Sequence, residues 1–125
     1  MSIEWFTGST KLVDKDPAVK LNKKYARFMF NKVLADKIKE NHTIPQKCMV
    51  GIDIDEKIFK IKISNDGNMK LTMTTLKIMG IHCKPIFQWL ADKGVDVEQN
   101  KYFEAEYDDI DTITVYYDKK IIESK

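Results

Sequence analysis

The chain has 125 residues, of which 43% are hydrophobic and 32% charged, and its formal net charge is +2. This length fits one domain or two very small ones, and the composition is typical of a soluble folded chain and excludes a disordered one. No apolar run approaches the roughly 20 residues that a membrane span needs. The first ten residues, MSIEWFTGST, also lack the basic and apolar regions of a signal peptide, so we expect a cytoplasmic protein without membrane contact.

Charge is distributed unevenly along the sequence. Residues 10–47 hold ten Lys or Arg against four acids, a local net charge of +6, whereas residues 91–118 hold two lysines against nine acids, a local −7. Two segments of opposite charge can attract different partners. The alternative interpretation is that two solvated surfaces differ in sign without binding anything.

The first 18 residues are expected to form an N-terminal arm that ends at Asp16-Pro17. Trp5 and Phe6 in this arm either pack against the domain or anchor a partner through exposed aromatic rings. Both interpretations remain open from the sequence.

The next segment predicts two strands and a short helix. Apolar residues alternate with lysines in 19–24, and aromatic residues dominate 25–30, so each predicts a strand. Asn31 is a good N-cap for a helix through Asn41, with Val33, Leu34 and Ile38 on its apolar face.

A hairpin and a strong turn follow this helix. In residues 48–64, Val50, Ile52 and Ile54 alternate on one arm, and Ile58 or Phe59 opens the other. The predicted hairpin turn is Asp55-Glu56-Lys57. Asn65-Asp66-Gly67-Asn68 is the strongest turn signal in the sequence.

The same order of elements then starts again. Residues 70–81 are strand-like, and a helix is predicted from Lys84-Pro85 to Lys93, with Gly94 as its stop. Residues 102–118 predict a second hairpin that turns near Asp108-Asp109.

Two sequence echoes support an internal repeat. LADKI (34–38) recurs as LADKG (90–94), and residues 52–63 match the profile of 106–117, at offsets of 56 and 54 residues. We therefore expect a first, basic repeat (19–64), a second, acidic repeat (69–118) and a short tail (119–125). A half of about 50 residues cannot bury a sufficient core alone. The predicted fold is α+β: two related halves packed as one pseudo-symmetric, β-rich domain with two short helices. Chance similarity between two β-rich halves is the alternative.

Residues 19–63 resemble the AbrB-type swapped-hairpin DNA-binding family. The stretch KLNKKYARFMFNKVLADKI places Tyr25-Ala26-Arg27 at the family's Leu-Gly-Arg position and Phe28-Met29-Phe30 at its hydrophobic triplet, and Asn31 replaces the family's Pro. MVGIDIDEKIFKIKI supplies the following strand pair. The resemblance implies DNA binding by interleaved hairpins, with a dimer formed inside one chain, and leaves a further homodimer open. The overall style resembles small phage or mobile-element proteins of low-GC Gram-positive bacteria.

Double-stranded DNA is therefore the first expected partner. Phosphate contacts require long cations on a rigid element, and Arg27 alone has the planar group that can bind a guanine edge in two places. The second half has no arginine. The candidate DNA-binding residues are Lys20, Lys23, Lys24, Arg27 and Lys32. Lysines on the solvated face of an ordinary hairpin are the alternative interpretation.

The acidic second hairpin predicts a different partner. An acidic surface can bind a basic host protein, as a phage-encoded inhibitor would do. The candidate residues for this alternative are Glu104, Glu106, Asp108, Asp109 and Asp111.

Enzymatic and cofactor chemistry have little support in the sequence. His42, Cys48, His82 and Cys83 could ligate zinc, but they have no metal-site spacing. The segment 7–11 lacks the spacing of a phosphate-binding loop, and no nucleophile motif is present. We expect a non-enzymatic protein without a cofactor.

Overall fold

The computed structural model describes residues 3, 5, 16–98 and 102–121. These residues form eight strands and two helices. The strands are β1 (Ala18–Asn22), β2 (Arg27–Phe30), β3 (Gln46–Asp53), β4 (Ile58–Ile63), β5 (Met69–Met73), β6 (Met79–His82), β7 (Tyr102–Asp109) and β8 (Thr112–Ile121), and the helices are α1 (Lys32–Lys39) and α2 (Lys84–Asp92).

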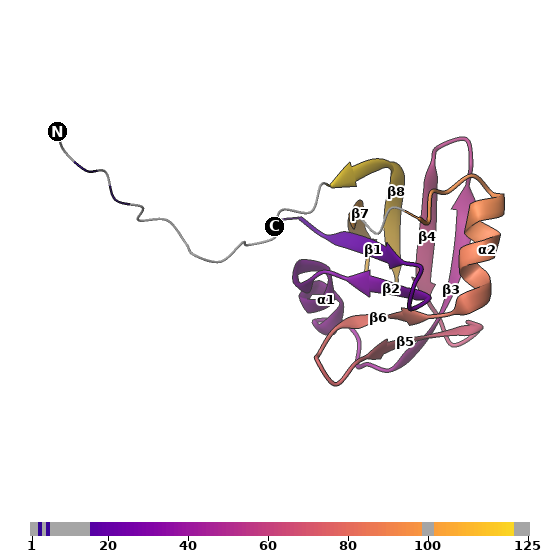
Figure 1. The fold of residues 1–125 in the computed structure, drawn as a ribbon. Coiled ribbons are helices and arrows are strands. Elements are labelled where there is room, and N and C mark those ends of the chain that lie inside the picture. Colours follow the sequence, from indigo (N-terminus) through magenta and orange to yellow (C-terminus); the bar gives the residue numbers. More distant parts are fainter. Residues whose placement is uncertain (1–2, 4, 6–15, 99–101, 122–125) are drawn as a thin grey trace.

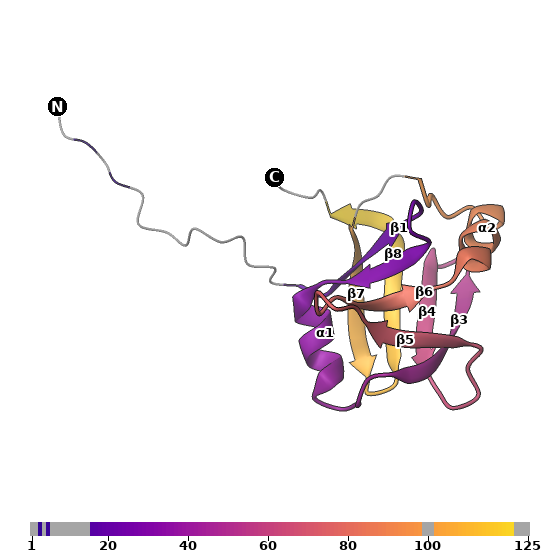
Figure 2. The ribbon, with the colours of Figure 1, turned by 60° about the horizontal axis from the view of Figure 1, so that its bottom comes forward.

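The described strands are all antiparallel and close into a barrel in the order β1-β2-β6-β5-β3-β4-β8-β7 (Figures 1 and 2). The hairpin β1–β2 borders β7 and β6, and the hairpin β3–β4 borders β5 and β8. Each hairpin therefore pairs only with hairpins from the other half of the chain. Exchanging β1–β4 with β5–β8 leaves the circular strand order unchanged.

The expected α+β class, rich in strands and with two short helices, is confirmed. Closure of the strands into a barrel is the feature that the sequence does not predict. It depends on pairs such as Ala18 with Glu104, which join β1 to β7 across most of the chain. A local pattern of apolar residues carries no information about such a distant pair.

The hairpin β3–β4 follows the predicted alternation with two differences. Phe59 and Ile61 are fully buried and Ile58 is only half-buried, so Phe59 opens the apolar face of β4. Ile54 was expected to extend the apolar face of β3, but it lies in the turn and is 50% exposed. Lys57 closes this turn with a φ of 56°.

Residues 70–81 were expected to be strand-like, and strands cover both ends of this segment. The segment forms β5, a turn and β6, and the side-chain oxygen of Thr74 accepts a hydrogen bond from the Ile78 N–H at 3.1 Å across the turn. Lys77 takes the left-handed conformation, with a φ of 62°. The turn contains no Gly, Pro or Asn, so the usual composition signals did not mark it.

The predicted helices form with small changes of length. Asn31 caps α1, and its side-chain oxygen accepts a hydrogen bond from the Leu34 N–H at 3.1 Å. This helix ends at Lys39 instead of Asn41. The second helix ends at Asp92, and Gly94 stops it with a φ of 94°. The two helices lie on opposite sides of the barrel (Figures 1 and 2).

One continuous core fills the barrel and extends under both helices. Phe28 lies at its centre: its ring centroid is 5.8 Å from that of Phe59 and 5.5 Å from that of Phe87. Because these rings come from β2, β4 and α2, Phe28 joins both halves through aromatic contacts. The closely packed core makes the barrel a rigid support for surface side chains.

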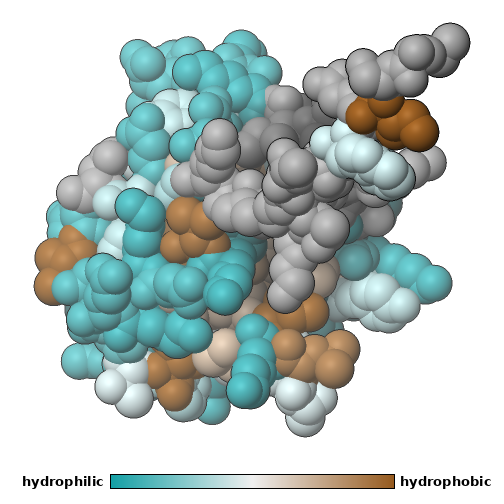
Figure 3. Space-filling view, turned by 90° about the vertical axis from the view of Figure 1, so that its left-hand side faces the viewer, coloured by the Kyte–Doolittle hydropathy of each residue, from teal (hydrophilic) through white to brown (hydrophobic). Residues whose placement is uncertain are grey.

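The surface is mostly hydrophilic on the side that carries α1. In Figure 3, hydrophobic residues on this side are scattered in small groups among hydrophilic ones. Neither described helix is long and apolar enough to cross a membrane.

Candidate nucleic-acid interface

The hairpin β1–β2 and its turn carry four of the five predicted basic residues. Leu21 pairs with Phe28 on the buried side, whereas Lys20 and Arg27 lie on the half-exposed side. The turn between the strands forms although Ala26 stands where a glycine is common. Ala26 takes a φ of 50°, a conformation that is strained for a residue with a side chain.

Arg27 is held by the neighbouring half of the barrel. Its Nη2 donates a hydrogen bond to the carbonyl of Ile78 at 3.1 Å, and its Nε is buried without a hydrogen-bond partner among the described residues. Burial lowers the pKa of Arg27 below its usual value. The side chain passes over β6 at Gly80, where an added Cβ would lie 3.3 Å from Nε. Arg27 therefore braces β2 against the β5–β6 hairpin.

The other four predicted cations do not form one site. Lys23 makes an exposed ion pair with Glu98, and the ammonium group of Lys20 lies 5.6 Å from the centroid of the Tyr102 ring. Lys24 lies 5.5 Å from the ring of its neighbour Tyr25, which is 61% exposed. An open hollow of about 530 Å³ surrounds this turn, lined by Asn22, Lys23, Lys24, Tyr25 and Glu98. Lys32 is exposed in the first turn of α1, beyond the opposite end of the hairpin.

The predicted acidic residues divide into two groups. Glu104 and Glu106 lie two residues apart on β7, half-exposed and exposed respectively. The hairpin was expected to turn near Asp108-Asp109, but β7 continues through Asp109 and the turn is Ile110-Asp111. The side chain of Asp108 lies outside the described part of the structure.

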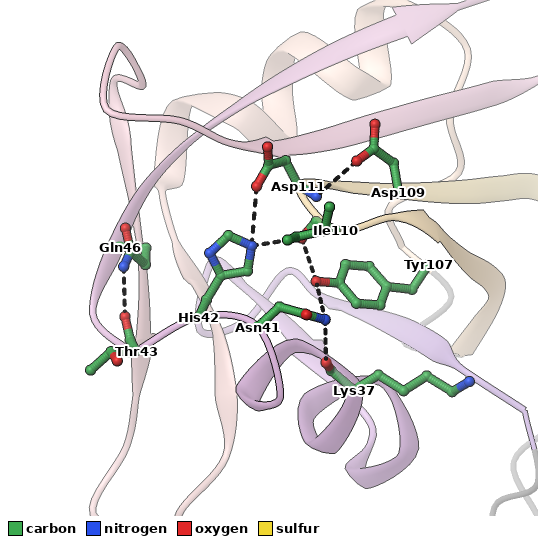
Figure 4. Close-up of polar contacts among 9 residues, drawn as sticks. All are labelled: Lys37, Asn41, His42, Thr43, Gln46, Tyr107, Asp109, Ile110 and Asp111. Atoms are coloured by element: carbon green, nitrogen blue, oxygen red, sulfur yellow. Dashed lines mark hydrogen bonds and ion pairs between the residues drawn. The ribbon is translucent and has the colours of Figure 1, made fainter.

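Asp111 takes part in a polar contact that fixes the end of α1 to the β7–β8 turn (Figure 4). The Nε2 atom of His42 lies 2.6 Å from the Ile110 carbonyl and 3.2 Å from Asp111 Oδ1. The Tyr107 hydroxyl donates to the same carbonyl and accepts a bond from Asn41 at 3.4 Å. Burial, followed by the charges of nearby acids, raises the pKa of Tyr107 above its usual value. This acidic turn therefore joins the two halves of the chain.

Four lysines that the sequence did not single out lie together on the outside of the barrel. We call them the lysine face: Lys47, Lys60, Lys62 and Lys70. All four are exposed, and among the described residues none of their ammonium groups makes a hydrogen bond or an ion pair. The alternation in IFKIKI (58–63) already placed two of them on one side. Their neighbours on β3 and β5 depend on strand register, which the sequence alone does not specify.

The residues considered for zinc are spread over the fold. His42 follows α1, Cys48 points into the core from β3, His82 is exposed on β6, and Cys83 precedes α2. Within the described ranges, no three His, Cys, Asp or Glu side chains gather as metal ligands. Trp5 in the arm is 77% exposed, and Phe6 lies outside the described residues.

Comparison with models of known protein families, with curated proteins and with solved structures finds no match to this chain.

Proposed function

We propose that this chain is a non-enzymatic DNA-binding protein that acts as a transcriptional or mobile-element regulator in a bacterial cytoplasm. The observation that carries the proposal is the division of charge over the barrel surface. Lysines point outward from β5, β3 and β4, which are consecutive in the barrel, whereas Glu104 and Glu106 point outward from β7, which lies between β8 and β1. Cations gathered on a rigid scaffold suit the phosphate backbone of DNA, and carboxylates elsewhere on the barrel repel it.

The arrangement of hairpins supports a related proposal about origin. We take the two halves to be copies of one AbrB-like unit whose swapped-hairpin dimer is contained in a single chain. The support is that each hairpin pairs only with hairpins of the other half, and that the strand order survives exchange of the halves. Such a chain needs no second copy to complete its barrel.

The proposal concerns phosphate contacts more than base reading. Arginine is the side chain best suited to a guanine edge, but Arg27 already donates to Ile78. Exposed lysines on the barrel surface supply the phosphate contacts instead. Binding with little dependence on base sequence is the expected behaviour.

The test is a fluorescence anisotropy titration of a labelled DNA duplex of about 20 base pairs, at about 50 and about 200 mM salt. Tight binding at low salt that weakens steeply at the higher salt is the expected result. Absence of binding at the lower salt would contradict the proposal.

The second candidate function is binding of a basic host protein, in the manner of a phage-encoded inhibitor. The observation that favours it is the pair Glu104 and Glu106 on the outer side of β7. Polylysine serves as a model partner, with E104Q/E106Q as the variant. If this surface is responsible, the native chain binds polylysine and the variant binds at least several-fold more weakly. Equal binding by both proteins would remove this candidate.

A further inference from the structure

The lysine face is formed by three neighbouring strands of the closed barrel. Lys60 and Lys62 alternate on β4 with the buried residues Phe59 and Ile61, so their side chains must point outward. Lys47 and Lys70 lie in the same way beside buried Cys48 and Leu71. Figure 1 shows β3 and β4 side by side, and β5 pairs with the other edge of β3.

Strand register places each of the four lysines beside at least one other. Lys47 and Lys70 are directly paired across β3 and β5, and Lys62 is paired with Met49, two residues along β3 from Lys47. Direct partners in an antiparallel sheet have Cβ atoms about 5 Å apart, and diagonal ones about 7–8 Å. The positive charges therefore form one continuous stripe.

Acids border this stripe at the end formed by Lys60 and Lys62: Asp53 is diagonal to Lys60 across β3 and β4, and Asp109 and Asp111 line the same hollow. Directly opposed like charges destabilise a sheet, and the Lys47–Lys70 pair is of this kind. The next strand offers Thr112 and Thr114 opposite Lys62 and Lys60, so the cross-strand neighbours on β8 are uncharged. An anion from outside the chain would relieve the repulsion.

The surface around the stripe is hollowed at two places. One hollow of about 320 Å³ is lined by Pro45, Gln46, Lys47, Asn65 and Lys70, so two amide side chains accompany the directly paired lysines. Another of about 470 Å³ contains Lys60 and Lys62 and ends at Asp109 and Asp111. The amide of Asp111 donates to Asp109 Oδ1 at 3.3 Å, and Asp111 Oδ1 faces His42. These acids mark the border of the basic stripe.

We infer that the lysine face is the surface that contacts the phosphate backbone of duplex DNA, without reading base sequence. This inference rests on the proposed function and assigns it a site. Lysine is a flexible point charge that suits phosphate, and the face holds no arginine or aromatic ring for base edges or stacking. Four phosphate contacts predict a slope of about −3.6 for log K against log salt, which is on the order of a 100-fold loss between 50 and 200 mM.

The test compares two variants that remove the same number of positive charges. The first is K47Q/K60Q/K62Q/K70Q, and the matched control is K20Q/K23Q/K24Q/K32Q, which alters the cations predicted from the sequence. Each is titrated with a random-sequence duplex over a series of salt concentrations. We expect the lysine-face variant to bind at least tenfold more weakly at low salt and to lose most of the salt slope, while the control keeps most of both.

The outcomes separate the site from the function. If the control variant loses binding and the lysine-face variant does not, the site is wrong and DNA binding stands. Equal losses would mean that net charge alone is responsible, which also overturns the site. If the native chain fails to bind at low salt, the proposed function fails, and the site with it. Thermal unfolding checks folding: Lys70→Gln should raise the melting temperature by relieving repulsion from Lys47, and a decrease would contradict the repulsive pair.

Discussion

The two halves of the barrel have the same order of elements, but their helices begin differently. In the first half, Asn31 is buried, and its Oδ1 accepts hydrogen bonds from the N–H groups of Ala18 at 3.0 Å and Leu34 at 3.1 Å. Its Nδ2 donates to the Asp16 carbonyl at 2.8 Å. One side chain thus forms hydrogen bonds with backbone groups at the start of α1 and at the start of β1.

In the second half, Cys83 occupies the corresponding position before α2 and makes no side-chain cap bond. Its backbone N–H donates to the Ala26 carbonyl at 3.0 Å, which ties α2 to the β1–β2 turn of the other half. The Asn31 N–H also makes a backbone bond, to the Ala18 carbonyl at 3.0 Å, so the side-chain cap is what the second half lacks. Changes at matched positions should have unequal effects.

The largest effect on stability is expected at Gly80, where β6 of the second half pairs with β2 of the first half. A Cβ added at Gly80 of β6 would lie 1.9 Å from the Phe28 carbonyl oxygen of β2. Gly80→Ala must force these paired strands apart, and we expect a loss of about 3 kcal/mol or more in the free energy of unfolding. Chemical denaturation measures it.

Gly51→Ala is the matched control for this change, because nothing lies within 4 Å of a Cβ added at Gly51. We expect its stability to change by less than about 0.5 kcal/mol. Similar losses from the two substitutions would show that steric contact between the halves is not the cause.

The helix starts provide the next test. Asn31→Ala leaves the buried N–H groups of Ala18 and Leu34 without their acceptor, so we expect a loss of about 2–3 kcal/mol. Cys83→Ala removes no cap bond, and its effect should stay below about 1 kcal/mol. Urea unfolding of both variants gives the comparison. A loss at Cys83 equal to that at Asn31 would remove the distinction drawn between the halves.

Cys48 in the first half is fully buried, and its thiol makes the stability of the fold depend on pH. Burial, with a smaller effect from negative charge on Cys83, raises the pKa of the Cys48 thiol from 9.0 to about 11. The folded state therefore keeps a proton that the unfolded state loses. The resulting stability is complete below pH 9 and is lost as the pH rises toward about 11.

We expect this loss to reach about 1–2 kcal/mol at the upper end, after allowance for solvent screening. Urea unfolding at several pH values between about 8 and 11 measures it. The slope should be smaller in Cys48→Ala, whose other titrating groups are unchanged. Cys83→Ala should reduce the slope only slightly, since burial is the larger cause. If the free energy of unfolding falls with pH equally steeply in Cys48→Ala, the loss of stability at alkaline pH comes from tyrosines or lysines instead.

The sequence predicted features that depend on local chemistry. Asn31 as an N-cap, Gly94 as a helix stop and the β3–β4 turn all follow from the behaviour of single residues or short patterns. The expected repeat also rests on short patterns, and its sequence offset differs from the spacing of the matching helices. LADKI and LADKG are 56 residues apart, whereas the helices that contain them start 52 residues apart, at Lys32 and Lys84. The matching letters are therefore offset by about one helical turn.

Features that depend on distant contacts could not be predicted in this way. Arg27 looked available for DNA, but the Ile78 carbonyl that it binds lies 51 residues further along the chain. The Lys47–Lys70 pair likewise exists only after β3 and β5 are brought into register. A local count of charges along the sequence therefore does not predict which charged side chains lie together on the folded surface.

Substitutions in the β1–β2 and β5–β6 turns are expected to change the stability of the two halves by the most similar amounts. Ala26 and Lys77 both adopt left-handed conformations, with φ of 50° and 62°, in the β1–β2 and β5–β6 turns. Glycine removes steric strain of about 1–2 kcal/mol there, but it also raises the conformational entropy of the unfolded chain. We therefore expect Ala26→Gly and Lys77→Gly each to stabilise the fold by about 0.5 kcal/mol.

Ala35→Gly, in the buried face of α1, is the control, and it should instead destabilise the fold by about 1 kcal/mol or more. Thermal unfolding distinguishes these signs. If Ala26→Gly lowers the stability while Lys77→Gly raises it, the Ala26 side chain stabilises the fold by packing against the core more than the strain of its turn destabilises it.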